Sequence, residues 1–292
     1  MNKNFNKGLL LTSLGSFWWG FIGVIYFEYV SFIGHVELVV HRCLWTAVML
    51  LLTTSFFSKW KIFLNIVSKK KNLFYLFVSG FLIFVNWAIW IYAVASERII
   101  DASFGYFIMP IISVLLGKIF FKEELNNKRI FSISLVCISI LILIFFNLKS
   151  LPWVGLIVAL SWAFYNLVRK KINVDTDTGL LIESLFIFPF ALIAFYIIAK
   201  NGLNDFNISN PGFSLFLILA GPMTVIPLFL YVRGVELIGL GPTGMIFYIT
   251  PTLQFILGYF YYNEDFSLVK FLSFIIIWVA VIIYLKDLYE NN

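Results

Sequence analysis

The chain has 292 residues, of which 61% are hydrophobic, 20% aromatic and only 12% charged. A soluble globular domain carries roughly twice that share of charged residues, which excludes an ordinary soluble protein. The formal net charge of +6 does not indicate a nucleic-acid surface, because the basic residues lie in short loops between hydrophobic runs. We therefore expect a single integral membrane domain.

Ten stretches of the chain have roughly the length of about 20 helical residues that crosses a hydrocarbon core. Backbone polar groups find no water in lipid, so such stretches are expected to be α-helices. We predict spans at 8–27, 36–57, 73–95, 101–121, 129–146, 152–170, 179–199, 213–233, 239–261 and 268–286. The two longer connections, 58–72 and 200–212, are predicted to be loops.

Two of these stretches repeat each other at an offset of 141 residues. The repeated residues are a proline, a glycine and a glutamate: Pro110, Gly117 and Glu123 in one, Pro251, Gly258 and Glu264 in the other. A second echo, at an offset of 143, relates SFWWGF (16–21) to ALSWAF (159–164). We predict two homologous five-helix repeats, residues 1–147 and 148–292. An odd number of spans inverts one repeat relative to the other, an architecture of secondary transporters.

The basic residues predict the orientation. With the N-terminus inside, 16 of the 21 lysines and arginines fall on the inner side and four on the outer side, with Arg42 inside a helix. Cytoplasmic loops carry such an excess of positive charge. We expect a multi-pass protein of the cytoplasmic (inner) membrane with both termini in the cytoplasm.

The sequence carries no pattern for a cofactor or metal. Neither Cys43 nor Cys137 lies in a CxxC or CxxxH pattern, and no GxxxxGK[ST] motif occurs. We expect two free thiols, no metal site, no cofactor and no ATP-driven transport within this chain.

Polar residues inside predicted spans are costly in lipid and so indicate function. Glu37 and His41 are one helical turn apart, and at an offset of 142 His41 corresponds to Glu183. We expect His41 and Glu183 to bind substrate or carry protons. Alternatively, His41 bonds a carbonyl, and Glu37 and Arg42 extend to the interface. Arg42 is expected to hold a substrate carboxylate or to neutralise Glu37.

Further candidates are an amide and several aromatic residues at membrane depth. Asn86 needs a partner, either another helix or a substrate. Aromatic residues away from the span ends line a cavity or pack in the core. They are Trp18, Trp19, Trp87, Trp90, Tyr106, Trp162, Tyr165 and Tyr248.

Two prolines interrupt predicted spans. Pro110 and Pro251 each remove a backbone donor and free a carbonyl one turn earlier, so each is a hinge, a source of a carbonyl ligand or a simple kink. Gly117 and Gly258 follow seven residues later and are expected to permit close helix contact.

Short segments along nearly the whole chain resemble the EamA family of the drug/metabolite transporter superfamily, and most closely its RarD branch. The segments are VVHRCLW, NWAIWIYAV, SFGYFIMP, FYNLVRKK, TGLLIES and FYITPT. The resemblance implies an all-α fold of ten helices in two inverted repeats, with a central cavity between the first four helices of each repeat. It implies substrate contacts at His41, Arg42, Asn86, Trp87, Tyr106, Tyr165, Glu183 and Tyr248.

Two positions depart from the family pattern. Met109 stands where the family pattern has an asparagine, and Phe247 where it has a glutamine. Both differences make the cavity less polar, so the substrate of any one relative is not carried over to this chain.

The sequence thus predicts a secondary transporter of small metabolites, such as amino acids or related amphipathic solutes, that works by alternating access. Its expected partners are a small-molecule substrate and the lipid bilayer, and no nucleic acid; a homodimer stays open. One alternative is an intramembrane enzyme that uses His41 and Glu183 as acid and base, although no nucleophile motif accompanies them. The other is a structural membrane protein that transports nothing.

Overall fold

The computed structural model describes residues 3–30, 32–95, 99–147, 153–172, 174–207, 210–261 and 268–291. All regular secondary structure in these ranges is helical. The first repeat predicted from the sequence contains α1 (Lys3–Phe17), the π-helical turn η1 (Trp18–Ile22), α2 (Gly23–Tyr29), α3 (His35–Phe56), α4 (Trp60–Val67), α5 (Lys70–Ala95), α6 (Ile99–Phe121) and α7 (Asn127–Asn147). The second contains α8 (Trp153–Lys171), α9 (Thr176–Lys200), α10 (Pro211–Ile218), α11 (Ala220–Ile238), α12 (Leu240–Ile246), α13 (Ile249–Phe260) and α14 (Leu268–Glu290).

Seven helical runs in the described ranges are long and apolar enough to cross a membrane, as expected for a multi-pass membrane protein. They are Lys3–Tyr29, His35–Phe56, Lys70–Trp90, Asn127–Phe146, Thr176–Lys200, Pro211–Ile238 and Leu268–Glu290. The remaining predicted spans coincide with α6, whose Gly105–Phe121 part is a shorter apolar helix, with α8, and with α12 and α13.

Two predicted elements differ from the structure. Residues 58–72, predicted to be a loop, contain α4, whose Ile66 is buried against Leu76 and Ile182 of the neighbouring helices. The span predicted at 239–261 is broken after α12, because Pro251 has no N–H to give to the Phe247 carbonyl. That carbonyl instead accepts a bond from Thr250 N at 2.9 Å, which tightens the chain there.

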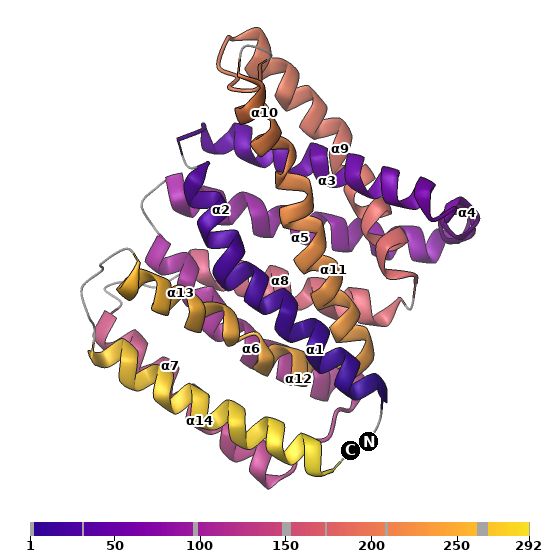
Figure 1. The fold of residues 1–292 in the computed structure, drawn as a ribbon. Coiled ribbons are helices and arrows are strands. Elements are labelled where there is room, and N and C mark those ends of the chain that lie inside the picture. The colour runs from indigo at the N-terminus through magenta and orange to yellow at the C-terminus, as the bar shows by residue number, and fades with distance from the viewer. Residues whose placement is uncertain are drawn as a thin grey trace.

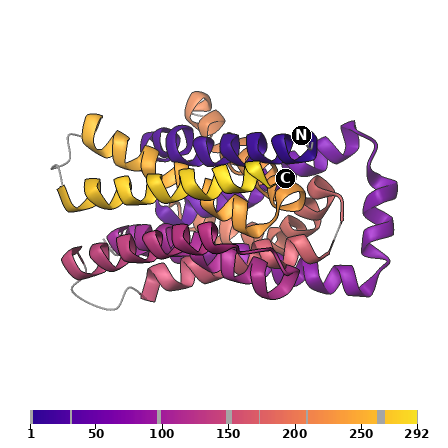
Figure 2. The ribbon, with the colours of Figure 1, turned by 90° about the horizontal axis from the view of Figure 1, so that it is seen from below.

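Helices at corresponding positions in the two predicted repeats contact each other in antiparallel fashion. α7 and α14 lie side by side along one edge of the molecule, and α3 packs against α9 at the other (Figure 1). The beginning of α1 and the end of α14 lie close together in both ribbon views (Figure 2).

Serine side chains join α7 to α14. Ser132 Oγ donates to the Ala280 carbonyl, and Ser139 Oγ donates to the Ser273 carbonyl at 2.9 Å. Backbone carbonyls in lipid have no water to bind, so such hydroxyl bonds between helices hold the pair in register.

Close helix approach depends on a glycine in α11. A Cβ on Gly221 would lie 2.5 Å from the Trp45 carbonyl oxygen of α3 and 2.7 Å from the carbonyl carbon. Backbone atoms cannot rotate away as a side chain can, so α3 and α11 would have to separate.

We predict that Gly221→Ala lowers the stability of the purified protein by about 1–3 kcal/mol, as overpacking of a helix contact does. Thermal unfolding in detergent measures this as a lower melting temperature. Gly212→Ala is the matched control, since no atom lies within 4 Å of a Cβ there. Equal melting temperatures for the two variants would contradict the close contact.

Candidate functional site

A cavity of about 300 Å³ lies between helices of both predicted repeats. Its lining is Trp19, Gly23, Val24, Phe27, Glu28, Arg42, Asn86, Trp87, Trp90, Tyr106, Trp162, Phe247, Thr250 and Gln254. These residues come from the η1–α2 run, the first turns of α3, the last turns of α5, the first half of α6, α8, the turn after α12, and α13. Seven of the fourteen are aromatic, so the walls suit a solute with an apolar body.

Aromatic rings meet at one end of this cavity. Trp19 and Trp162 pack edge to face with ring centroids 5.2 Å apart, and Tyr106 lies 5.9 Å from Phe247. Trp19 and Trp162 occupy the same position of the SFWWGF/ALSWAF echo, and Tyr106 and Phe247 are 141 residues apart. Corresponding residues of the two predicted repeats therefore touch each other here.

Arg42 is the cationic residue in the cavity lining. Its Nε donates to Thr224 Oγ1 of α11 at 3.0 Å. Its guanidinium carbon lies 4.6 Å from the Trp87 ring centroid and 5.2 Å from that of Phe27. Of the two roles expected for Arg42, pairing with Glu37 is not found; the carboxylate of Glu37 is engaged elsewhere.

Glu37 and His41 form a separate buried network that holds Asp205 and Phe206, which follow α9. Glu37 accepts bonds from the backbone N–H groups of Asp205, at 2.8 Å, and Phe206, at 3.3 Å. Trp45 Nε1 donates to His41 Nδ1, which leaves His41 Nε2 as the donor to Glu37 at 3.3 Å. The segment after α9 is thus tied to the start of α3.

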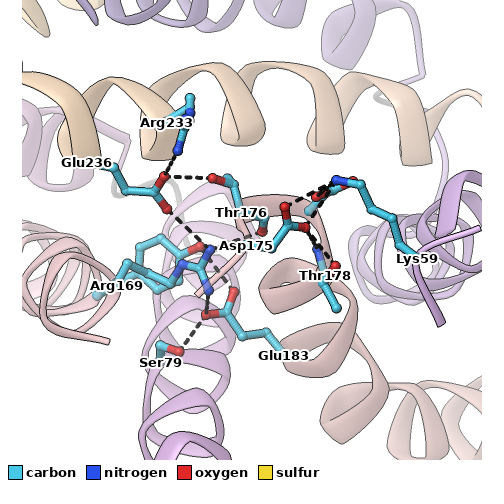
Figure 3. Close-up of polar contacts among 11 residues, drawn as sticks. Lys59, Ser79, Arg169, Asp175, Thr176, Thr178, Glu183, Arg233 and Glu236 are labelled. Atoms are coloured by element: carbon cyan, nitrogen blue, oxygen red, sulfur yellow. Dashed lines mark hydrogen bonds and ion pairs between the residues drawn. The ribbon is translucent and has the colours of Figure 1, made fainter. Parts of the chain in front are cut away.

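Glu183 belongs to a second buried network beyond the aromatic end of the cavity (Figure 3). Ser79 Oγ donates to its carboxylate at 2.5 Å and the Tyr165 hydroxyl at 3.2 Å. Arg169 Nη1 lies 3.5 Å from Glu183 Oε1, and both side chains are at most 3% exposed. Glu183 faces α5 and α8 and does not line the cavity, and its expected contact with substrate stays a prediction.

The second network continues from Arg169 to the end of α11. Arg169 Nη2 donates to the Thr176 carbonyl at 3.0 Å and lies 3.9 Å from Glu236. Thr176 Oγ1 and Arg233 both donate to Glu236 at 2.8 Å (Figure 3). We call Ser79, Tyr165, Arg169, Thr176, Glu183, Arg233 and Glu236 the Arg169 network.

The cavity and the Arg169 network are connected through one face of α8. Trp162 lines the cavity, and Tyr165, one turn further on, stacks on it at 5.4 Å between centroids. Arg169 follows one turn later. Residues three to four apart share a helix face, so α8 leads from the cavity directly to the ion pairs.

Glu123 connects three helix ends beside this network. Its carboxylate accepts bonds from the backbone N–H groups of Leu240 and Gly241, both at 2.8 Å, and lies 2.7 Å from Lys170 Nζ. A carboxylate at the N-terminus of a helix satisfies unpaired donors there. We expected Gly117 to permit close contact with a second helix. The atoms nearest to a Cβ at this position instead belong to the Glu123 carboxylate. Glu264 and the side chain at 258 lie outside what the structure describes.

Lys59 forms ion pairs with Asp175 at 3.1 Å and Asp177 at 2.7 Å, at the start of α9 (Figure 3). Burial disfavours the charged ammonium, but the hydrogen bonds with Asp177 and Asp175 outweigh it and raise the pKa of Lys59. Burial also opposes ionisation of Asp175, but its bonds with Asp177, Thr178 and Lys59 prevail and lower its pKa.

The structure thus divides the predicted site residues into two groups. Arg42, Asn86, Trp87 and Tyr106 line the cavity, whereas His41, Tyr165, Glu183 and Tyr248 do not. Asn86 also serves as a link between helices, since its amide nitrogen donates to the Val158 carbonyl at 2.9 Å.

Tyr248, Pro110 and Pro251 do not line the cavity. Tyr248 donates to the Phe107 carbonyl at 2.8 Å. Pro110 lies inside α6 and Pro251 in the first turn of α13.

Sequence reasoning missed several residues of these sites, and four of them show why. Thr224, which orients Arg42, and Thr250 and Gln254 in the cavity lining stand in ordinary apolar surroundings with no pattern around them. Arg169 was counted as a loop charge because it opens the run Arg169–Lys171. Its spacing of seven residues from Trp162 indicates the face that the two residues share.

We predict that Glu183→Gln destabilises the folded protein by about 3–5 kcal/mol, because Arg169 then remains as a buried charge without its closest carboxylate. Replacing both residues, as Arg169→Met with Glu183→Gln, should restore most of the loss. Thermal unfolding of the single and double variants measures this, with the exposed Glu290→Gln as control. Additive losses would show that the two side chains do not interact.

We predict that Lys59→Met lowers the free energy of unfolding by about 0.2–1 kcal/mol at pH 7, because it removes the two ion pairs. A carboxyl group with a lowered pKa stabilises the fold above its unfolded pKa of about 3.9, and this contribution is lost as the pH falls through the folded pKa. The difference between wild type and variant should therefore shrink below about pH 4. Melting temperatures at pH 7 and over a series from about pH 4 down to about pH 2.5 test this, with Lys61→Met as the control, since Lys61 is exposed. A pH-independent difference would indicate packing alone.

Comparison with known proteins shows what the chain resembles. The sequence profile of the EamA-like transporter family matches residues 6–145 and again residues 150–286. The chain is 33% identical over 285 residues to Protein RarD of Escherichia coli K12, covering 98% of this chain and 96% of that protein. It is 34% identical over 282 residues to an uncharacterized transporter of Vibrio cholerae, covering 96% and 92%.

A solved crystal structure that is 12% identical superposes with a TM-score of 0.70, covering 95% of this chain and 96% of the other, which shows a common fold. The profile matches and the relatives over nearly the full length show the family. The chain belongs to the EamA-like transporter family of the drug/metabolite transporter superfamily, in its RarD branch.

Proposed function

We propose that this membrane protein is a secondary transporter that moves small amphipathic metabolites, such as amino acids and related solutes, across the cytoplasmic membrane by alternating access. The observation that carries the proposal is the arrangement along α8: an aromatic cavity at Trp162, and beyond it the buried Arg169 network. An alternating-access carrier requires a path of this kind, which can hold a solute at one end while ion pairs close the other end.

The proposal includes ten spans in two inverted repeats, residues 1–147 and 148–292. The two matches of the family profile support the repeats. The serine bonds between α7 and α14 support the inversion: Ser132 and Ser273 are 141 residues apart, as are Ser139 and Ala280, so exchanging the repeats turns one bond into the other. Exchange of antiparallel neighbours requires an axis across the helices, and an axis along the membrane normal would make them parallel.

The same correspondence relates the two ends of the path. His41 and Glu183 correspond at an offset of 142, as do Arg42 and Ser184. In the opposite conformation, Ser184 takes the place in the cavity wall that Arg42 has now, and the Arg169 network opens while the Glu37 side closes. His41 and Glu183 are the candidate proton carriers, and Pro110 and Pro251 the candidate hinges. The excess of positive charge favours cytoplasmic termini and a cavity facing outward.

The intramembrane enzyme is the less favoured alternative. Its acid and base would be His41 and Glu183, yet His41 contacts Glu37 and Trp45 whereas Glu183 contacts Ser79, Tyr165 and Arg169. Groups held in separate networks cannot share one reacting bond, because general acid–base catalysis needs both within hydrogen-bond reach.

Cysteine accessibility tests the proposal without a known substrate. Single cysteines are introduced at Gln254 in the cavity and Ser184 beyond it, in a background without Cys43 and Cys137. We predict that an impermeant thiol reagent applied outside intact cells labels position 254 and not position 184. Adding Glu236→Gln, which weakens the Arg169 network, should lower labelling at 254 and expose 184 from the cytoplasmic side.

Two further cysteines control the orientation. Asn204→Cys should react from outside, and Lys70→Cys only after the membrane is breached. Labelling of 184 and 254 from the same side in every variant would contradict alternating access. Labelling of position 70 from outside would reverse the assigned orientation.

A further inference from the structure

Among the residues that the structure describes, no carboxylate pairs with the guanidinium of Arg42, although Glu28 lines the same cavity. The contacts of this guanidinium are the Thr224 hydroxyl and the rings of Trp87 and Phe27. Over the described ranges, no carboxylate lies within ion-pair distance of it. Glu37, one turn before it on α3, is already bound by Asp205, Phe206 and His41.

Such a cation is costly to keep in an apolar cavity. An arginine stays charged under all ordinary conditions, and a desolvated charge without a counter-ion is strongly unfavourable. Ring faces offset part of this cost. A guanidinium has five N–H donors, and Thr224 takes the one on Nε. The planar fork that remains matches a carboxylate in bidentate geometry.

The position of Arg42 is fixed in advance of binding. The Thr224 hydroxyl itself donates to the Ala220 carbonyl at 2.8 Å, which aims its lone pairs at Arg42 Nε. Trp87 covers the face of the guanidinium at 4.6 Å. A charged side chain held on α3 by α5 and α11 loses little conformational freedom when an anion arrives, which favours binding.

The size and the lining of the rest of the cavity indicate what the other end of the solute is like. Its volume of about 300 Å³ is at the lower end of the range for ligand sites. Trp19, Trp90, Trp162 and Phe247 present rings to it. One small apolar or aromatic group fills such a space.

We propose that the substrate is an amphipathic anion with one carboxylate, which Arg42 binds, and a compact aromatic or branched apolar body, which the tryptophan-rich walls enclose. This inference rests on the proposed transport function and narrows its substrate class. The carboxylate is the group that selects the solute, because Arg42 is the cationic residue of the lining; Glu28 is its acidic residue, and Asn86, Thr250 and Gln254 are its neutral polar residues besides Tyr106 and the tryptophans.

Matched probes of one shape test the proposal. The probes are 3-phenylpropionate, its neutral amide 3-phenylpropionamide, and the amine 3-phenylpropylamine. Binding to the purified protein is measured by tryptophan fluorescence and by the rise in melting temperature that a ligand of the folded state produces. We expect the acid to bind wild type roughly 10-fold or more tightly than the amide, since a hydrogen bond to a charged group is worth about that much. The amine should not bind.

Variants at the cation provide the second half of the test. Arg42→Gln should weaken the acid roughly 10-fold or more and leave the amide unchanged. Arg42→Lys should give an intermediate loss, because it keeps the charge without the fork. Lys286→Gln is the control, since that side chain is 73% exposed. Equal binding of acid and amide to wild type, or no binding of the acid, would overturn the inference even if Arg42→Gln fails to fold.

Counterflow in proteoliposomes separates this inference from the proposed function. Exchange of labelled acid but not amide supports both. Binding of the acid without exchange would leave the anion site standing and contradict transport. Equal exchange of acid and amide would leave transport standing and overturn the anion site.

Discussion

The interaction on which the rest of this structure depends is the buried contact between Arg169 and Glu183. Neither side chain meets water, so each is tolerable in the apolar interior only with the other in place. The contact joins α8 to α9, and the same side chains reach α5 through Ser79 and α11 through Glu236. Four helices are thereby fixed at the end of the molecule beyond the cavity, and the aromatic rings rest on this closed end.

The other polar groups follow the same physical requirement. Glu37 finds backbone N–H groups in the segment after α9, and Glu123 finds those at the start of α12. Each acid joins elements distant in the chain, because no water is present in lipid to satisfy it. Arg42 stands apart: its charge is oriented by a hydroxyl and two rings and left without an anion. Contacts between helices thus satisfy Glu37 and Glu123, whereas Arg42 is the group to which the proposal assigns a substrate carboxylate.

Composition was sufficient to predict a helical membrane domain, and polar residues at depth led to Arg42 and Asn86. Prediction failed where an effect depends on a partner distant in sequence. Arg169 was grouped with the loop lysines, since nothing in the sequence RKK indicates that Arg169 pairs with Glu183 on the next helix. The break in the helix before Ile249 was missed, because it arises when Pro251 leaves the Phe247 carbonyl without its usual donor and Thr250 N bonds to that carbonyl instead. The α4 segment was too short to register as a span, although its apolar face packs against α9. Glu183 is buried, as its depth in a predicted span indicated, and it contacts Arg169 and Ser79; its role in binding substrate or carrying protons stays a prediction.

The central claim is that the two ends of the bundle open in alternation. The most direct measurement is pulsed electron spin resonance on two spin-label pairs: Lys69 with Lys122 at the end near the Arg169 network, and Asn201 with Phe260 at the end near the cavity. In the Glu236→Gln variant, relative to wild type, the account predicts that the first distance grows while the second shrinks. Distances that change together, or a network end that separates while the cavity end stays fixed, would contradict it.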